Sequence, residues 1–294
     1  MDFEYNYIKK HFGGNLALGT QQMLQNKLRS NPKSLLDYIV SCLDLSGTES
    51  IIDVACGNGF ILRDVVTKLR NGGRVVALDI SETMLNLAKE NVNIAWVPIE
   101  YVKDDATKMD ISKYGKFDRI MVNFLFHYIA EPDCFIPILK TLLNPGGRLN
   151  IAIEARNSMA KMYSMHFEGM QQAGFPEDFM KNLPRGRRGK MVLDNAREYL
   201  EKFFDHIIEV PYKNKLIFST TDEYMQFYVD GHGYCGVRAN SGTWFTEDMK
   251  SALERYVRNV VETEIREFGV FCLETQNSIF ICTEQELKNF KSIY

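Results

Sequence analysis

The chain has 294 residues, of which 45% are hydrophobic, and its formal net charge is −3. This composition supplies apolar side chains for one large core or two modest ones, which excludes a disordered or fibrous protein. A weakly acidic chain has no overall positive field that would attract polyanions, so we expect no nucleic-acid partner.

The six cysteines are scattered, with no Cys-x-x-Cys pair and no His/Cys cluster at the spacing of a zinc site. We therefore expect no metal site, and we expect the reduced, mostly buried thiols of a cytoplasmic protein. The first residues contain no apolar leader core, and no apolar run is long enough to span a bilayer. The sequence thus predicts no membrane partner, and it leaves open a monomer or a homodimer.

Helices are predicted before the first strand, including an amphipathic one at 35–43, and we assign residues 1–46 to an N-terminal helical cap. Between residues 50 and 154, short apolar runs then alternate with segments of helical period. This alternation is typical of a doubly wound α/β fold, in which helices cover both faces of a mostly parallel sheet. The predicted strands are 51–55, 75–80, 99–103, 117–126 and 148–155, and Asn-Pro-Gly-Gly at 144–147 is predicted to end a helix.

The turn after the first predicted strand has the sequence DVACGNG, residues 53–59. Gly57 and Gly59 allow the main chain to pass close to a ligand, and the start of the next helix offers free N–H donors. A dinucleotide fingerprint would need a third glycine at position 62, where the chain has leucine. The alternative to a binding turn is a tight strand-to-helix connection.

Acidic residues stand at the ends of three successive predicted strands: Asp53, Asp79 and Asp105. Asp79 is placed to accept both hydroxyls of a ribose. Asp105 is placed to accept an adenine amino group, beside Ala106, which leaves room for the ring. Each acid alone could be a surface or capping residue. Together they predict a row of acceptors along one crevice, because the carboxyl ends of parallel strands meet at one edge.

These motifs resemble those of the class I S-adenosylmethionine-dependent methyltransferases, particularly the ubiquinone-type and arsenite-type small-molecule group. The resemblance spans residues 50–154 and rests on five motifs in order: DxxCGxG at 53–59, DISxxMLxxA at 79–88, DA at 105–106, FDxI at 117–120 and LxPGGxL at 143–149. It implies S-adenosylmethionine as cofactor and S-adenosylhomocysteine as product. It also implies a seven-stranded sheet whose last strand, at 278–283, runs antiparallel.

The resemblance assigns a contact to each residue of the predicted cofactor site. Gly57 and Gly59 would lie against the methionine part, Asp79 would bind the ribose, and the Asn123 backbone would approach the methionine amino group. Adenine would be bordered by Ile80 and Met84 and bound by Asp105. The complete predicted set is Asp53, Gly57, Gly59, Asp79, Ile80, Met84, Asp105, Ala106 and Asn123.

The resemblance predicts methyl transfer to an oxygen, nitrogen or carbon of a small organic molecule, in specialised or cofactor metabolism. Arsenite is disfavoured because the cysteines show no thiolate cluster in the sequence. A dehydrogenase is disfavoured by the missing third glycine, and by a lone Tyr-x-x-x-Lys pair that precedes the cofactor turn. An RNA or protein methyltransferase would carry Asn-Pro-Pro-Tyr after the fourth strand, where this chain has VNFLFHY. A non-catalytic cofactor-binding protein of the same fold remains an alternative.

Methyl transfer from a sulfonium depends mainly on alignment of the nucleophile, the methyl carbon and the sulfur. A base is required only where the nucleophile arrives protonated, and histidine is the usual residue. His127 follows the fourth predicted strand, so it is the first catalytic candidate; its alternative role is to hold the Asn123 loop. His166 is the second candidate. It belongs to a Met-rich stripe at 159–170 that is typical of a core but also suits a lid over an apolar guest.

Substrate binding is expected outside the cofactor motifs, at Tyr7, Tyr128, Glu154 and Arg187. Tyr7 belongs to the helical cap that the resemblance places over the active site, and packing on the sheet is its alternative. Arg187 lies in the basic segment 183–190, which is either a clamp for a carboxylate or phosphate or a solvated loop. Residues 47–294 are predicted to form the methyltransferase domain, with helical lid insertions around 156–202 and 220–265.

Overall fold

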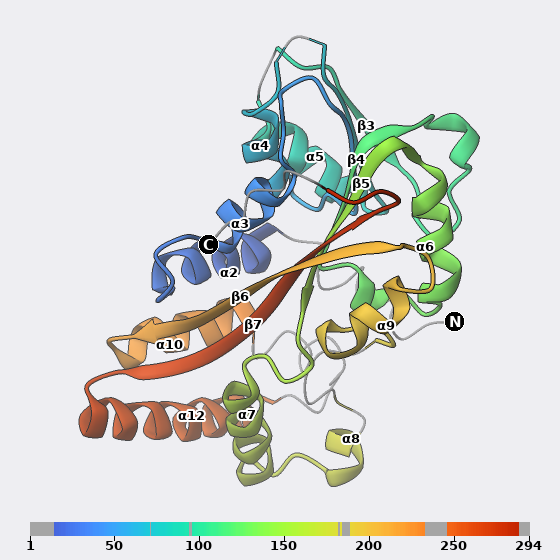
Figure 1. Ribbon diagram of the computed structural model, residues 1–294. Coiled ribbons are helices and arrows are strands. Elements are labelled where there is room, and N and C mark those ends of the chain that lie inside the picture. The colour runs from blue at the N-terminus through green and yellow to red at the C-terminus, as the bar shows by residue number, and fades with distance from the viewer. Residues whose placement is uncertain are drawn as a thin grey trace. The chain divides into compact units, whose positions relative to one another are not determined.

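The computed structural model describes residues 15–70, 72–93, 96–181, 183, 189–232 and 246–287 (Figure 1). Its contacts divide the chain into two compact units, which are described separately. We call residues 33–156, 188–212 and 276–294 the sheet unit, and residues 1–32, 157–187 and 213–275 the helical unit. Two long strands contribute residues to both units.

A seven-stranded sheet with the order β3-β2-β1-β4-β5-β7-β6 is formed by the described residues. Strands β1 to β5 pair in parallel, whereas β7 pairs antiparallel with β5. The predicted fold class and the antiparallel last strand are therefore confirmed. The strands are β1 Ser50–Val54, β2 Arg74–Asp79, β3 Ile99–Lys103, β4 Phe117–Asn123, β5 Leu143–Glu154, β6 His206–Phe218 and β7 Phe271–Thr283.

Alternate residues of the central strands pack into two different apolar clusters, as the two-residue side-chain period of a strand requires. Ile51 belongs to a cluster with helices α4 and α5, whereas Ile52 belongs to a cluster with α6 and α9. Both faces of the sheet are thus covered (Figure 1). The helices are α4 Phe60–Val66, α5 Glu82–Asn91, α6 Pro132–Thr141 and α9 Ala196–Leu200, with short turns η1 Ile111–Lys113, η2 Phe126–Tyr128 and η3 Leu193–Asn195.

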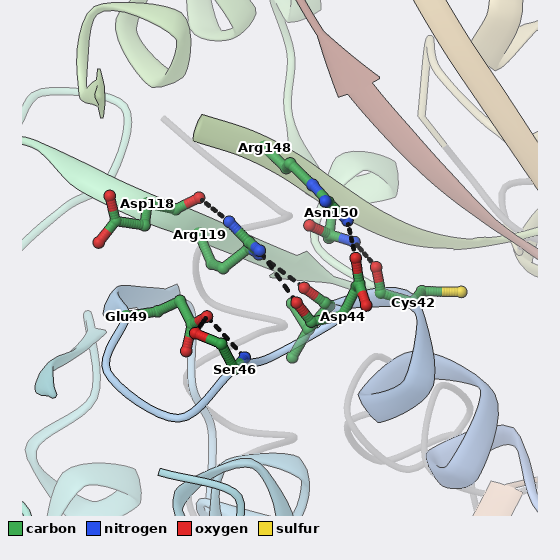
Figure 2. Close-up of polar contacts among 9 residues, drawn as sticks. Cys42, Asp44, Ser46, Glu49, Asp118, Arg119, Arg148 and Asn150 are labelled. Carbon is green, nitrogen blue, oxygen red and sulfur yellow. Dashed lines mark hydrogen bonds and ion pairs between the residues drawn. The ribbon is translucent and has the colours of Figure 1, made fainter. Parts of the chain in front are cut away.

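Helix α3, Leu35–Cys42, is fastened to the sheet by side chains that reach its last carbonyl groups (Figure 2). The buried Arg119 guanidinium donates to the Leu43 oxygen over 2.6 Å and to the Asp44 oxygen over 3.0 Å. Asn150 donates to the Cys42 oxygen over 2.9 Å. Carbonyls at a helix end have no partner within the helix, so these donors complete α3.

A second arginine lies beside the first one. Arg119 and Arg148 are directly opposite in the register of β4 and β5, and Arg148 pairs with the Asp44 carboxylate at 3.0 Å (Figure 2). Burial, and then the neighbouring Arg148 charge, lower the pKa of Arg119. This polar cluster lies at the amino ends of the parallel strands, so it serves the fold and not a site at their carboxyl ends.

The helical unit has its own apolar core, built from methionine and aromatic side chains. Met162 and Met170 of α7 are buried in it, so the Met-rich stripe is part of a core, as its spacing favoured. Helix α7 lies against α12 (Figure 1), where a Cβ on Gly169 would come within 2.6 Å of Leu253. The helices are α2 Asn15–Leu28, α7 Ala160–Gln172, α8 Glu177–Lys181, α10 Thr221–Gln226, the π-helix η4 Phe227–His232 and α12 Glu247–Phe268. Among the helices described, none combines the length and apolar character that crossing a bilayer requires.

Candidate active site

The candidate site begins at the turn after β1, which is held in an unusual backbone conformation. Ala55, Gly57 and Gly59 have positive φ values of 62°, 56° and 74°. The Cys56 amide donates to the Leu78 oxygen of β2 over 2.9 Å, which fixes the turn to the neighbouring strand. A left-handed alanine is strained, and such strain is concentrated at binding sites.

The two glycines of the turn have different surroundings. A Cβ on Gly59 would lie 2.9 Å from Val92 and 3.0 Å from Ala88, so glycine is needed there for α5 to approach. A Cβ on Gly57 would meet nothing within 4 Å. Packing against α5 therefore explains why glycine is needed at position 59, whereas open space lies beside Gly57.

Asp79 connects the end of β2 to the glycine turn. Its carboxylate accepts the Gly57 amide over 2.8 Å and the Ser81 amide over 2.9 Å. Burial raises the pKa of Asp79, although these backbone donors act in the opposite direction. Each carboxylate oxygen has a second lone pair, so Asp79 can still accept a ligand hydroxyl.

Asp53, near the end of β1, is buried, with 2% of its surface exposed. Burial, and then the charge of Asp79, raise the pKa of Asp53 to about 8. The charge of Asp79 disfavours ionisation of Asp53, because burial removes the water that would otherwise screen it. A cation bound here would relieve that cost.

The end of β3 contributes Asp105, which lies two residues beyond the partner of Asp79 in the β2/β3 register. Its Oδ1 accepts the amide and the hydroxyl of Thr107 over 3.0 and 2.7 Å. Partial burial alone would raise its pKa, but the Thr107 hydrogen bonds and the Lys108 charge bring the pKa below its ordinary value. Beside this edge, Ile80 is 39% exposed, whereas Met84 is buried.

The end of β4 forms the other side of the site. Val54 is opposite Val122, so the turn after β1 lies next to Asn123. The Asn123 Nδ2 atom is buried and has no hydrogen-bond partner within the described part of the chain. Phe124 follows with a positive φ of 56°. The chain thus has strained residues after both strands at the point where the strand order reverses, the usual ligand site of such sheets.

The predicted substrate-facing residues of the sheet unit follow the same edge. His127 is buried in η2, and its ring centroid is 4.0 Å from that of Tyr128. Glu154 is the buried last residue of β5 and pairs with Asn277 of β7. The structure therefore brings His127, Tyr128 and Glu154 to the carboxyl ends of β4 and β5.

For three other predicted site residues, the described structure gives no place at the carboxyl ends of these strands. His166 lies in the core of the helical unit, where its Nδ1 is 2.6 Å from the Tyr228 hydroxyl oxygen and burial lowers its pKa to about 4. Tyr7 and Arg187 lie outside the described residues. The roles proposed for these three side chains stay predictions.

Sequence reasoning missed two contacts of predicted residues, one in the helical unit and one at the site. Tyr228 is the hydrogen-bond partner of His166, but nothing in the sequence pairs residues 62 positions apart. Gly189 lies against the backbone of His127, and its only signal was its place at the end of the basic segment.

A cavity of about 380 Å³ lies elsewhere in the sheet unit. It is lined by Thr283, the last residue of the antiparallel β7, so it lies toward the amino ends of the parallel strands, whereas Asp53 and Asp79 lie at their carboxyl ends. It is not part of the candidate site. Its lining residues are Arg197, Glu201, Asp205, His206, Ile207, Ile208, Thr283, Glu286 and Leu287.

Residues 51–147 match a protein-family model described as a methyltransferase domain. A ubiquinone biosynthesis O-methyltransferase from Ralstonia nicotianae is 27% identical over 151 residues, which cover 51% of this chain and 58% of that protein. A demethylmenaquinone methyltransferase from Lactococcus lactis is 33% identical over 129 residues, 42% of this chain and 49% of that protein. The chain spans about half the length of the curated relatives it matches.

Solved structures share the fold. Phosphoethanolamine N-methyltransferase 2 from Haemonchus contortus, in complex with phosphomonomethylethanolamine and S-adenosylhomocysteine, aligns with a TM-score of 0.57 and 14% identity, covering 97% of this chain and 61% of that one. A Bacillus halodurans protein assigned as a methyltransferase aligns with a TM-score of 0.52 and 17% identity, covering 86% and 100%. Residues 51–147 of this chain are therefore similar to a methyltransferase domain, and the predicted glycine turn and the acids Asp53, Asp79 and Asp105 all lie within them.

Proposed function

We propose that this protein is an S-adenosylmethionine-dependent methyltransferase that acts on an oxygen, nitrogen or carbon atom of a small organic molecule. The observation that carries the proposal lies at the carboxyl ends of β1 and β2, where the Gly57 turn is next to the buried carboxyl groups of Asp53 and Asp79. The match to a methyltransferase domain supports the same reaction class. So do the curated relatives, which are named as methyltransferases of ubiquinone biosynthesis and of demethylmenaquinone.

The residues of this edge fit the proposed cofactor. Open space beside Gly57 can receive a ligand without displacing a side chain. The exposed Ile80 offers an apolar surface for a ring, and Asp79 and Asn123 offer polar atoms on either side of the turn. Buried carboxyl groups favour a molecule with cationic sulfonium and amino groups. Dinucleotide-binding folds also carry an acid at the end of the second strand, so the argument against a dehydrogenase is the leucine at position 62 in place of the third glycine.

When bound, the cofactor supplies a methyl carbon already activated by the sulfonium. The protein's own part in the proposed reaction is to fix positions: the β1 and β4 turns fix the donor, and η2 and the end of β5 orient the acceptor. His127 takes the proton from an acceptor that arrives protonated. Tyr128 and Glu154 hydrogen-bond to polar groups of the substrate.

The finer proposals rest on sequence features. The acidic net charge supports the proposal of a small-molecule substrate without a nucleic-acid partner, and the scattered cysteines support a cytoplasmic location. A monomer or homodimer is likewise proposed. The competing function is a cofactor-binding protein without turnover, because the glycine turn and the acids account for binding alone.

Thermal unfolding with different ligands tests the proposal. S-adenosylmethionine and S-adenosylhomocysteine should each raise the midpoint of unfolding, because a ligand that binds only the folded state stabilises it. NAD should have no effect. A shift with NAD alone would end the methyltransferase proposal. Formation of S-adenosylhomocysteine with a panel of small phenols, quinols and amines then separates an enzyme from a protein that only binds the cofactor.

A further inference from the structure

Gly189 makes an unusually close approach to the backbone of His127. A Cβ at position 189 would lie 2.6 Å from both the Cα and the oxygen of His127, and 2.8 Å from its carbonyl carbon. Cβ atoms do not approach backbone atoms below 3.0 Å. Since these neighbours are backbone atoms, no side-chain rotation would relieve the contact. Its φ of +106° is also a conformation for which glycine is suited.

The segment around Gly189 is fastened to the same edge of the sheet unit. The Arg156 guanidinium, just beyond β5, donates to the Gly189 oxygen over 3.3 Å. Lys190 pairs with Glu131, just beyond η2, over 2.6 Å. We call residues 189–195 the brace. It is attached at two points, by Arg156 after β5 and by Glu131 before α6.

The brace is also a rigid piece of structure. Met191 is buried in the apolar cluster that includes residues of α6 and α9, and the next residue, Val192, is buried as well. The Asn195 side chain accepts the Val192 amide over 2.9 Å and donates to the Lys190 oxygen over 2.7 Å. The Arg156 amide donates to Asp194 over 2.9 Å. A segment with a buried apolar anchor and closed hydrogen bonds can hold its neighbour in place.

We propose that Gly189 is a positioning residue, which sets the place of His127 at the carboxyl end of β4 through direct backbone contact. This inference rests on the proposed function, because it gives the position of His127 a purpose. Gly189 itself touches no reacting atom. Its effect passes through η2, where a displacement of about 1 Å would misalign a proton acceptor and slow the reaction by up to about 100-fold.

The test compares Gly189→Ala with Gly72→Ala. Gly72 has a φ of +105°, almost the same as Gly189, but a Cβ there would meet nothing within 4 Å. Both variants therefore place alanine at nearly the same positive φ, and only the first presses on His127. We expect Gly189→Ala to shift the His127 imidazole signal in NMR pH titrations, assigned with His127→Gln, and Gly72→Ala to leave it unchanged. Turnover should fall about 10- to 100-fold in Gly189→Ala alone, with S-adenosylhomocysteine affinity retained.

The outcomes separate the two proposals. If wild-type protein binds no S-adenosylhomocysteine, the proposed function fails, while the His127 signal still tests the contact. If that signal and turnover in Gly189→Ala match those of Gly72→Ala, the positioning role is overturned. Should Gly189→Ala not fold, Arg156→Gln removes the bond to the Gly189 oxygen from an exposed side chain. Arg156→Gln should shift the His127 imidazole signal in the folded protein, and an unchanged signal would overturn the positioning role of Gly189.

Discussion

The backbone amide of Gly57 donates a 2.8 Å hydrogen bond to the carboxylate of Asp79. This bond links the turn after β1 to the end of β2, so two parts of the candidate cofactor site are fixed together. A ligand that binds Asp79 therefore meets a turn already held in place, and little ordering is needed when it binds.

We expect Asp79→Ala to weaken binding of S-adenosylhomocysteine by roughly 10- to 100-fold, the value of a lost hydrogen bond to a charged group. The variant loses an acceptor for the ligand and the bond to Gly57. Calorimetry measures the affinity. Asp110→Ala is a suitable control, because Asp110 also accepts a local amide, that of Ser112, but caps η1. If Asp79→Ala and Asp110→Ala bind S-adenosylhomocysteine equally well, Asp79 is not part of the cofactor site.

Alanine at the two glycines of the turn should have different effects. Gly57→Ala should cost about 1 kcal/mol of folding free energy through its positive φ, while its Cβ enters the open space and weakens S-adenosylhomocysteine binding. Gly59→Ala should cost a further 1 to 3 kcal/mol, about the usual cost of overpacking, because it overlaps Val92 and Ala88. Urea unfolding and calorimetry on both variants check this. Unimpaired binding by a folded Gly57→Ala protein would contradict it.

Asp53 should make the protein less stable as the pH rises. Its pKa is about 8 in the folded protein, against an ordinary value of 3.8. Between these values the folded state holds a proton that the unfolded chain has released. The free energy of unfolding should therefore fall with rising pH, by up to about 1.4 kcal/mol per pH unit. Urea unfolding of wild type and Asp53→Asn across this range measures the difference, and identical slopes would refute the prediction.

His166 should have the opposite effect in acid. Burial lowers its pKa from an ordinary 6.5 to about 4. As the pH falls through this range, the unfolded chain takes up a proton that the folded helical unit excludes, so stability is lost. The protection of α7 amides against hydrogen exchange, corrected for the pH dependence of the intrinsic exchange rate, should fall as the pH is lowered between these values in wild type. It should change less in His166→Gln, which cannot titrate there. The same acid response in both proteins would show that His166 is not the cause.

His127→Ala should slow methyl transfer while leaving cofactor affinity nearly unchanged, because the residue follows the end of β4 and lies beyond the acids of the cofactor edge. Single-turnover rates with an acceptor identified in the panel measure the step itself. A rate equal to that of wild type would leave His127 with only the role of holding the loop.

The sheet could be predicted because its signals are local. Ile51 and Ile52 begin an apolar run that is buried on both faces, and the acids Asp53 and Asp79 follow strands whose carboxyl ends share one edge. The prediction for residues 144–147 was less accurate. Helix α6 ends at Thr141, and the Asn-Pro-Gly-Gly sequence belongs to the irregular start of β5.

The contacts that could not be predicted join residues far apart in the chain. Nothing in the sequence around Gly189 indicates that its neighbour is His127, or that Tyr228 meets His166. The motifs also do not show that Gly59 is required by α5 and Gly57 is not. Such differences depend on which residues lie opposite each position after folding. Hydrophobic periodicity and composition do not contain this information.

The polar cluster that holds α3 bears on the order in which the chain can acquire its structure. The Leu43 oxygen receives its hydrogen bond from a residue 76 positions later, and the Cys42 oxygen from one 108 positions later. During synthesis, these carbonyl oxygens can bond only to water until β4 and β5 have left the ribosome. The end of this early helix is thus completed only after β5 has been synthesised.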